Sequence, residues 1–200
     1  MNSHGDHTQV QGRAWSEHEY MLSFFISMQV GAVWGHCYEN AYPLFFAIPE
    51  LFDPHGLFIE GWIVFEDTDR VVLMEHGWLL SRQQYIVDPT IVLAVEISQP
   101  VYYYPGVSRA RAELEALENE FFPHVRFSGY RDDGMQHAGY LAAYESALQK
   151  ARSMLSEKKT FVEVKATLLP SQDEVVSQSS DFGVIVVQRN GGGPHGQERG

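Results

Sequence analysis

Apolar and polar positions alternate with two periodicities along the chain, one typical of helices and one typical of strands. Residues 15–31 form a long, mostly apolar stretch that predicts a buried or half-buried helix. Residues 37–48 predict a partly helical segment, in which Pro43 removes one hydrogen bond and kinks or ends the helix. The alternative is that the helix begins at Pro43, which leaves Cys37 in the preceding loop. Ser108 is the predicted N-cap of a later amphipathic helix, and a second one follows it. Their apolar positions are Ala110, Leu114, Leu117 and Phe121, and then Leu141, Tyr144, Leu148, Ala151 and Leu155.

Three β-rich segments follow one another closely before the later helices. Residues 58–65, 71–80 and 84–88 predict three strands of a meander. Polar breaks at 67–69 and 81–83 provide the turns that a meander needs.

Further strands are predicted at 92–104, ending at Pro105-Gly106, and at 161–169 and 183–187. The order is helices, then a run of strands, then a mixture of both. This order predicts an α+β fold, because regular strand–helix alternation is missing.

The chain of 200 residues is long enough for one domain with a substantial core. We expect a single domain over residues 13–188. Residues 1–12 and the glycine-rich residues 189–200 are expected to be flexible tails.

The charge balance limits the classes of partner. The chain has 14 Lys and Arg against 26 Asp and Glu, a formal net charge of −12. Nucleic-acid binding needs a clustered basic surface, and no Lys/Arg-rich run exists here, so no nucleic-acid partner is expected. The longest apolar stretch, residues 20–34, is interrupted by Ser23, Ser27 and Gln29 and does not predict a membrane span. These features predict a soluble, cytoplasmic protein.

Cys37 is the single cysteine of the chain, which rules out an intrachain disulfide and fits a reducing compartment. It follows Trp34-Gly35-His36, a stretch that can open a helix. A thiol at a helix N-terminus and near an imidazole gains thiolate character, so Cys37 is the candidate nucleophile. The alternative is that Cys37 is a buried, inert filler, as lone cysteines often are.

Strand register predicts that His76 and Asp88 are neighbours. In an antiparallel hairpin, directly paired residues lie on one face. A loop centred on Arg82 pairs His76 with Asp88, with Cβ atoms about 4.5–5.5 Å apart. A loop centred on Thr68 likewise pairs Glu60 with His76, which predicts a row across three strands. An error of one residue in either turn scatters this row.

The roles of the three candidate catalytic residues follow from their chemistry. Cys37 is the nucleophile and His76 the base, while Asp88 accepts a hydrogen bond from the imidazole and fixes its tautomer. The alternative for Asp88 is that its side chain begins a turn before Pro89.

Two motif regions resemble a known superfamily. EHGWL at 75–79, followed by VDPT at 87–90, is similar to the His and Asp motifs of the transglutaminase core. In that core a His-small-Trp strand precedes an Asp-Pro-Thr strand. CYENA at 37–41, with EGW at 60–62, resembles the nucleophile region of small bacterial and phage members. The resemblance covers residues 31–90, less than half of the chain.

The resemblance implies a papain-like or transglutaminase-like core with N-terminal helices packed on an antiparallel sheet. It implies acyl chemistry at an amide, ester or thioester by Cys37, His76 and Asp88, on a protein or peptide substrate and without a cofactor. The outcome is either hydrolysis, as in a peptidase or deamidase, or acyl transfer. The superfamily also has inactive members, so the alternative is a catalytically inactive module that binds or inhibits a protein.

Further residues are candidates for supporting or substrate-binding roles. Gln29 has the amide side chain that a papain-like site uses as an oxyanion donor, and the Cys37 backbone N–H is the alternative donor. Glu60 is a structural partner of His76 or a substrate contact. Asn40 belongs to the cysteine motif, and three tryptophans either pack the core or wall the pocket. These are Trp34, Trp62 and Trp78.

A metal site is the remaining alternative. His36, Cys37, His76 and Asp88 provide ligand types that suit Zn²⁺. No His-x-x-x-His or Cys-x-x-Cys pair anchors such a site, so no metal is expected. The acidic surface suits a basic protein partner, in keeping with the binding alternative. The substrate and the oligomeric state are left open by the sequence.

Overall fold

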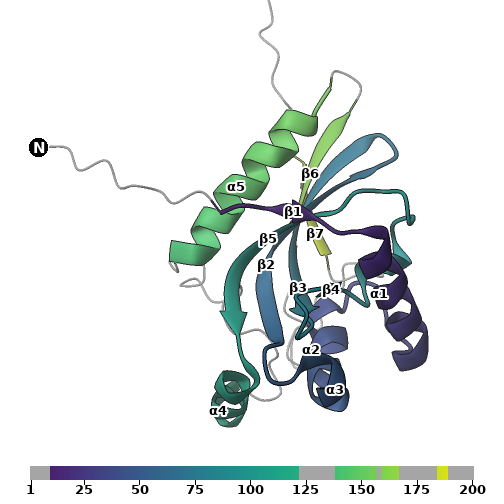
Figure 1. Cartoon of the computed structure of the whole chain (residues 1–200). Coiled ribbons are helices and arrows are strands. Elements are labelled where there is room, and N and C mark those ends of the chain that lie inside the picture. The colour runs from purple at the N-terminus through teal and green to yellow at the C-terminus, as the bar shows by residue number, and fades with distance from the viewer. Residues whose placement is uncertain (1–9, 122–137, 157–158, 167–183, 189–200) are drawn as a thin grey trace, which may run out of the picture.

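A mixed β-sheet with helices against it forms the centre of the molecule in the computed structural model (Figure 1). The structure describes residues 10–121, 138–156, 159–166 and 184–188. The helices are α1 (Glu17–Val30), α2 (Cys37–Ala47), α3 (Pro49–Phe52), α4 (Arg111–Phe121) and α5 (Ala138–Met154), with a 3₁₀ turn η1 (Ile91–Leu93). The strands are β1 (Arg13–Ala14), β2 (Leu57–Asp67), β3 (Arg70–Leu80), β4 (Ile86–Val87), β5 (Tyr102–Arg109), β6 (Thr160–Ala166) and β7 (Val184–Gln188).

The sheet has the strand order β1-β5-β2-β3-β6-β7, and the short β4 pairs with the end of β3. Strands β2, β3 and β4 form the predicted antiparallel meander. The β3–β6 pair is parallel, which makes the sheet mixed. The predicted α+β class is therefore confirmed, but the prediction of an antiparallel sheet was wrong for the β3–β6 pair.

Local sequence signals explain where α1 begins and ends. The Ser16 hydroxyl accepts a hydrogen bond from the Glu19 N–H, and the Glu19 carboxylate accepts one from the Ser16 N–H, which completes a capping box. Gly31 ends the helix in the left-handed conformation, with φ of 63°. Helix α2 begins at Cys37 and continues through Pro43, so the proline does not end it.

The prediction of one strand over residues 92–104 was wrong. Its beginning is occupied by η1, and β5 runs on to Arg109 through Pro105 and Gly106. Glu60 pairs with Val107 and Gly61 with Pro105, so Gly106 is the extra residue of a β-bulge in β5, and such a bulge accommodates a proline within a strand. Ser108 therefore lies in a strand and does not cap α4.

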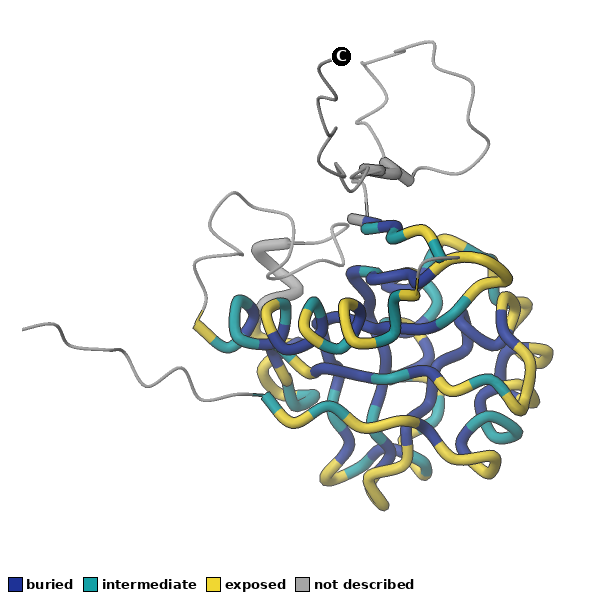
Figure 2. The backbone as a smooth tube through the Cα atoms, turned by 90° about the horizontal axis from the view of Figure 1, so that it is seen from above, coloured by how far each residue is buried: buried dark blue, intermediate teal, exposed yellow. Residues whose placement is uncertain are grey.

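The sheet has two buried faces, as the dark central strands in Figure 2 show. The α1 face packs against Trp15, Tyr20 and η1, and the α5 face packs against α5. Members of the α1 face are Ile59, Ile63, Val72, Met74, His76, Trp78 and Tyr103. Members of the α5 face are Glu60, Trp62, Val64, Leu73, Glu75 and Tyr104.

The predicted register between the second and third strands was wrong by one residue. Glu60 pairs with Gly77, and Gly61 pairs with His76. The turn contains two residues, and Thr68 adopts a positive φ of 48°, so the turn is not centred on Thr68. Because side chains alternate between faces, this single step places Glu60 on the face opposite His76.

The predicted tails and the end of the domain lie largely outside the described residues, as do residues 167–169 of the predicted strand 161–169. Within the described part, no helix is long and apolar enough to cross a membrane.

Replacing Gly61 by Ala is expected to lower the free energy of unfolding by about 2–3 kcal/mol. A Cβ at this position would collide with the Tyr104 carbonyl oxygen and lie 2.9 Å from the Trp78 ring. Urea titration measures the loss. Gly31→Ala is the control, because nothing lies within 4 Å of its Cβ position and only its φ of 63° is unfavourable, so it should cost about 1 kcal/mol. Equal losses in the two variants would contradict the packing argument.

Candidate active site

Cys37 lies at the first position of α2, directly after the N-cap residue His36. The body of α2 packs on the α5 side of the sheet, with Tyr38 and Leu44 among the residues that cluster with Phe58 and Leu79. The Cys37 side chain keeps 5% of its surface exposed. The helix start predicted from the sequence is thus confirmed, and it presents the thiol at the end of the helix where backbone N–H groups are free of helical partners.

A gap in strand pairing makes room for this helix start. On the outer side of β3, β6 pairs with residues 70–74 and β4 pairs with residues 79–80. Among the described strands, none pairs with this side of β3 between those segments, and α2 contacts β3. The Tyr38 ring lies so close to Gly77 that a Cβ there would be 3.0 Å from it. Gly77 therefore allows the residue after Cys37 to rest directly on the strand that carries His76.

His76 and Asp88 form a buried hydrogen-bonded pair. The distance from His76 Nε2 to Asp88 Oδ2 is 2.8 Å, and the two side chains are 1% and 0% exposed. The predicted neighbourhood is confirmed, but the predicted register was wrong by two positions, since Leu79 pairs with Val87. A shift of two keeps both side chains on the α1 face, so the pair is diagonal rather than directly opposite.

The Asp88 carboxylate is held by four hydrogen bonds. Its Oδ1 accepts from the Thr90 and Ile91 N–H groups, both at 3.1 Å, and its Oδ2 accepts from His76 and from the Tyr103 hydroxyl at 3.0 Å. The Asp88 side chain therefore begins a turn, as the alternative interpretation predicted, and it also accepts a hydrogen bond from the imidazole.

Two residues that the sequence analysis did not single out complete this environment. Ser23 accepts a hydrogen bond from the Asp88 N–H at 2.9 Å, and Tyr103 donates to Oδ2. Burial, and then the negative charge of Asp88, raise the pKa of Tyr103 well above its usual value, so its hydroxyl remains a donor. A serine within an apolar helix was the available signal for Ser23. Tyr103 could have been singled out only if the limits of β5 had been predicted correctly.

The pKa of His76 is raised to about 10 from an ordinary value of 6.5. Burial is the largest single effect and lowers the pKa of His76. The charge of Asp88, the charge of Cys37 and hydrogen bonding to both residues raise it, and together they outweigh burial. His76 Nδ1 is buried and has no hydrogen-bond partner among the described residues.

Trp78 supports His76 from within the sheet. The two rings stack at 6.4 Å between centroids and 18° between planes, and the edge of Trp78 meets Tyr103 at 5.2 Å. Gly61 leaves the space that the indole occupies. Gly61 of the EGW segment and Gly77 of the EHGWL segment are thus required by packing, because Trp78 and Tyr38 occupy the space that a side chain there would need.

Asn40 connects three segments around the site. Its Nδ2 donates to the Val33 carbonyl at 2.7 Å and to Thr90 Oγ1 at 2.8 Å, and its Oδ1 accepts from the Val33 N–H at 3.2 Å. Helix α2, the loop before it and the turn after Asp88 are therefore tied together by one side chain.

Three other supporting residues do not join this group. Gln29 is exposed on the last turn of α1 and forms no hydrogen bond among the described residues. Trp62 lies on the α5 face, where its ring meets Tyr144 at 4.8 Å, so it packs the core. The observed register, which differs by one residue from the predicted one, places Glu60 on that same face, and Glu60 is fully buried.

Glu60 belongs to a second buried polar group, behind the strand that carries His76. The Tyr140 hydroxyl donates to Glu75 Oε1. Burial first, and then Tyr140, Glu75 and Glu60, raise the pKa of Tyr38 well above its usual value. Tyr38 is therefore an uncharged anchor at the beginning of α2.

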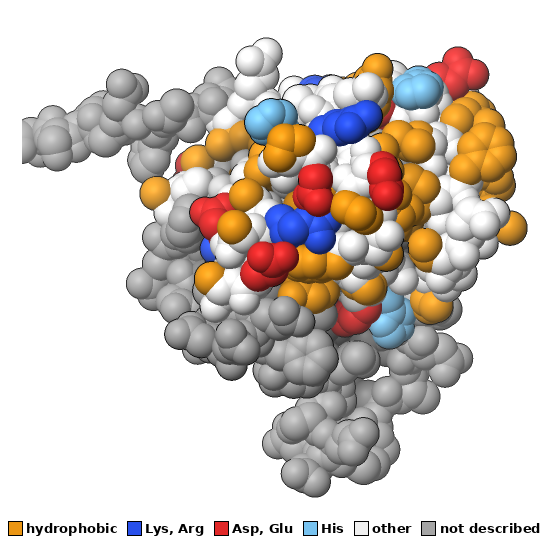
Figure 3. All heavy atoms as spheres, turned by 60° about the horizontal axis from the view of Figure 1, so that its bottom comes forward, with side chains coloured by type: hydrophobic (Ala, Val, Ile, Leu, Met, Phe, Trp, Pro, Cys, Tyr) orange, Lys and Arg blue, Asp and Glu red, His pale blue; other side chains and the backbone are white. Residues whose placement is uncertain are grey.

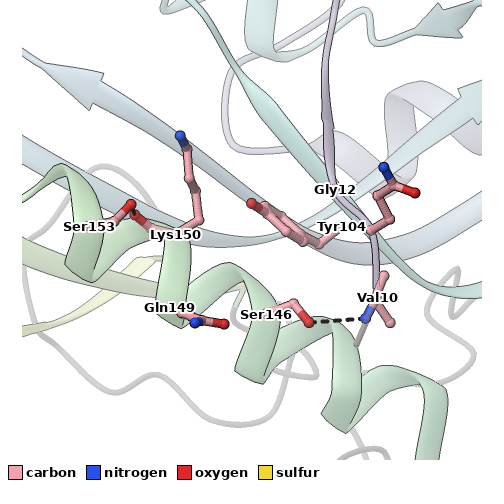
Figure 4. A pocket seen from close by; sticks show the side chains of 8 residues that line it. Val10, Gly12, Tyr104, Ser146, Gln149, Lys150 and Ser153 are labelled. Carbon is pink, nitrogen blue, oxygen red and sulfur yellow. Dashed lines mark hydrogen bonds between the residues drawn. The ribbon is translucent and has the colours of Figure 1, made fainter. Parts of the chain in front are cut away.

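Two hollows among the described residues bear on the candidate residues. A groove of about 620 Å³ lies between the segment Val10–Gly12, Tyr104 of the α5 face, and α5, where the Val10 N–H donates to Ser146 Oγ (Figure 4). A smaller hollow of about 360 Å³ is lined by Trp34 and Met74, on the α1 face that carries His76. Trp34 thus walls this hollow. Within the described part, no cluster of three or more His, Cys, Asp or Glu suits a metal ion.

Comparisons of the chain with protein-family models, with curated proteins and with solved structures gave no match.

Replacing Asp88 by Asn is expected to lower the pKa of His76 from about 10 toward 6.5, because the amide carries no charge. A raised folded-state pKa stabilises the fold fully below pH 6.5, and this contribution is lost as pH rises through about 10. The free energy of unfolding, from urea titrations between these two pH values, should therefore fall less steeply in Asp88→Asn than in the wild type. Asp69→Asn, at a carboxylate 70% exposed, should keep the wild-type slope. Parallel slopes for Asp88→Asn and wild type would contradict the assignment.

Proposed function

We propose that this protein performs thiol-dependent acyl chemistry at an amide, ester or thioester, with Cys37, His76 and Asp88 as its catalytic residues. The observation that supports this best is the buried 2.8 Å His76–Asp88 pair, with a cysteine at a helix start acting on the same imidazole. A fully buried ion pair is expensive to maintain, and perturbed groups of this kind concentrate at functional sites. We further propose a papain-like or transglutaminase-like core, a cytoplasmic location and a protein or peptide substrate.

The proposed reaction has two steps. The Cys37 thiolate attacks the carbonyl carbon and forms a C–S bond, while the His76 proton passes to the leaving nitrogen, oxygen or sulfur as its bond to carbon breaks. Water or an amine then attacks the thioester carbonyl, the C–S bond breaks, and His76 takes up the proton of the attacking group. Asp88 stabilises the imidazolium in the resting enzyme and after the second step.

The chain offers a donor for the oxyanion of both steps. The first backbone N–H groups of a helix have no helical acceptor, so the Cys37 N–H is suited to this role. The exposure of Gln29 on α1 does not support it as the second donor.

Hydrolysis is the outcome that we propose first, since it needs no site for an acceptor amine. Transfer uses the same acyl-enzyme and requires only that an amine reaches the thioester before water does.

A catalytically inactive binding module is the second candidate function. The observation that favours it is the small exposed fraction of the site, 5% for Cys37 and 1% or less for His76 and Asp88. A basic protein is the partner class that fits a net charge of −12. On the surface view in Figure 3, acidic and basic side chains of the described residues are interspersed with hydrophobic ones, so this face offers no large patch of one sign.

The rate of iodoacetamide alkylation at Cys37 tests the catalytic proposal. The imidazolium of His76, whose pKa is about 10, should activate the neighbouring thiol, so alkylation of Cys37 at pH 7 should be faster than that of an ordinary cysteine. His76→Ala should reduce the rate at pH 7 by about 100-fold, and Asp88→Asn by about tenfold, as expected for loss of a buried charged partner. Mass spectrometry of the labelled chain measures the rates.

His36→Ala is the matched control, because His36 precedes Cys37 but makes no side-chain cap hydrogen bond. It should alkylate at the wild-type rate. Slow alkylation that rises only above pH 8 and is unaffected by His76→Ala would favour the inactive module.

A further inference from the structure

The hollow of about 360 Å³ on the α1 face is apolar on nearly every side. One loop wall, one sheet wall and the η1 region enclose it. Its apolar lining is formed by Trp34, Phe65, Val72, Met74, Leu93 and Ala94. Ligand sites in proteins are mainly apolar hollows of this size, with a few polar groups that orient the ligand.

None of the three proposed catalytic residues lines the hollow, but two of its lining residues lie close to them along the chain. Met74 is two residues before His76 on the same face of β3, which places their Cα atoms about 6.6 Å apart along the strand. Trp34 is three residues before Cys37, in the loop that Asn40 ties to α2. One wall thus comes from the nucleophile's side and another from the base's side.

The charge of the lining selects among possible occupants. Asp67 is the one charged residue of the lining, and its carboxylate lies 3.8 Å from the Arg70 guanidinium at the turn. An acidic group in the hollow would meet this carboxylate, and the repulsion between the two like charges is moderate because the Asp67 side chain is 50% exposed. Leu93 is 43% exposed and Val33, next to Trp34, is 54% exposed, so apolar surface continues outside the hollow.

We propose that this hollow binds an uncharged aromatic or branched aliphatic side chain of a peptide substrate, next to the carbonyl that Cys37 attacks. This inference rests on the proposed function and adds the substrate class to it. Continuous apolar surface beyond the hollow is suited to the flanking residues of a peptide. Peptides with an acidic side chain at this position are rejected.

Chloromethyl ketones of single acetylated amino acids test the proposal, because the Cys37 thiolate displaces chloride and forms a stable C–S bond. The reagents carry the side chain of Phe, Gly or Asp. The Phe reagent should alkylate Cys37 about tenfold or more faster than the Gly reagent, since an aromatic side chain gains from leaving water. The Asp reagent should be slower than the Gly reagent.

Substitutions of residues that line the hollow test whether the preference for the Phe reagent arises there. Leu93→Asp, at a partly exposed position, and Trp34→Ala should each reduce the Phe-to-Gly rate ratio to less than about threefold. Ile97→Asp is the matched control, because Ile97 is 40% exposed but does not line the hollow, and it should keep the wild-type ratio.

The two proposals fail in different ways. Fast iodoacetamide alkylation that depends on His76, combined with equal rates for all three ketones, would overturn the substrate class and leave the proposed function standing. A Phe preference that survives both lining variants would also overturn it. Slow alkylation by every reagent, unaffected by His76→Ala, would overturn the proposed function itself.

Discussion

A carboxylate and an imidazolium buried together are the constraint around which this structure is arranged. Neither charge is tolerated away from water unless its neighbours replace the lost solvation. Asp88 receives this replacement from two backbone N–H groups, the Tyr103 hydroxyl and the His76 ring. These donors come from β3, β5 and the turn after β4, so the pair can form only when these parts of the chain are assembled. The fold and the charged pair therefore require each other.

The sheet also decides from which direction the thiol arrives. Strands β6 and β4 each cover only part of the outer side of β3, and α2 contacts the strand where neither pairs. The helix packs its apolar residues on one face, while its first residue acts on His76, which belongs to the other face. Gly77 and Gly61 allow this close approach, because each leaves space for an aromatic ring, that of Tyr38 or that of Trp78.

Much of this arrangement could be predicted from the sequence, and the errors have physical causes. The limits of α1 follow from the capping box at Ser16 and from Gly31, which are local properties, whereas α2 begins at Cys37 without a side-chain cap. Glu60 was misplaced because register depends on turn conformation, and the positive φ of Thr68 is not apparent from its residue type. The pairing of His76 with Asp88 survived an error of two positions only because side chains alternate with a period of two. Tyr103 could not be found, since a bulge beside Gly61 determines how β5 aligns.

The single amide of Asn40 has a mechanical consequence. It joins the loop that holds Trp34 to the helix that begins with Cys37 and to the turn that begins with Asp88. Loss of this one amide would therefore release three segments from one another: the backbone at Val33, the first turn of α2 and the turn at Thr90.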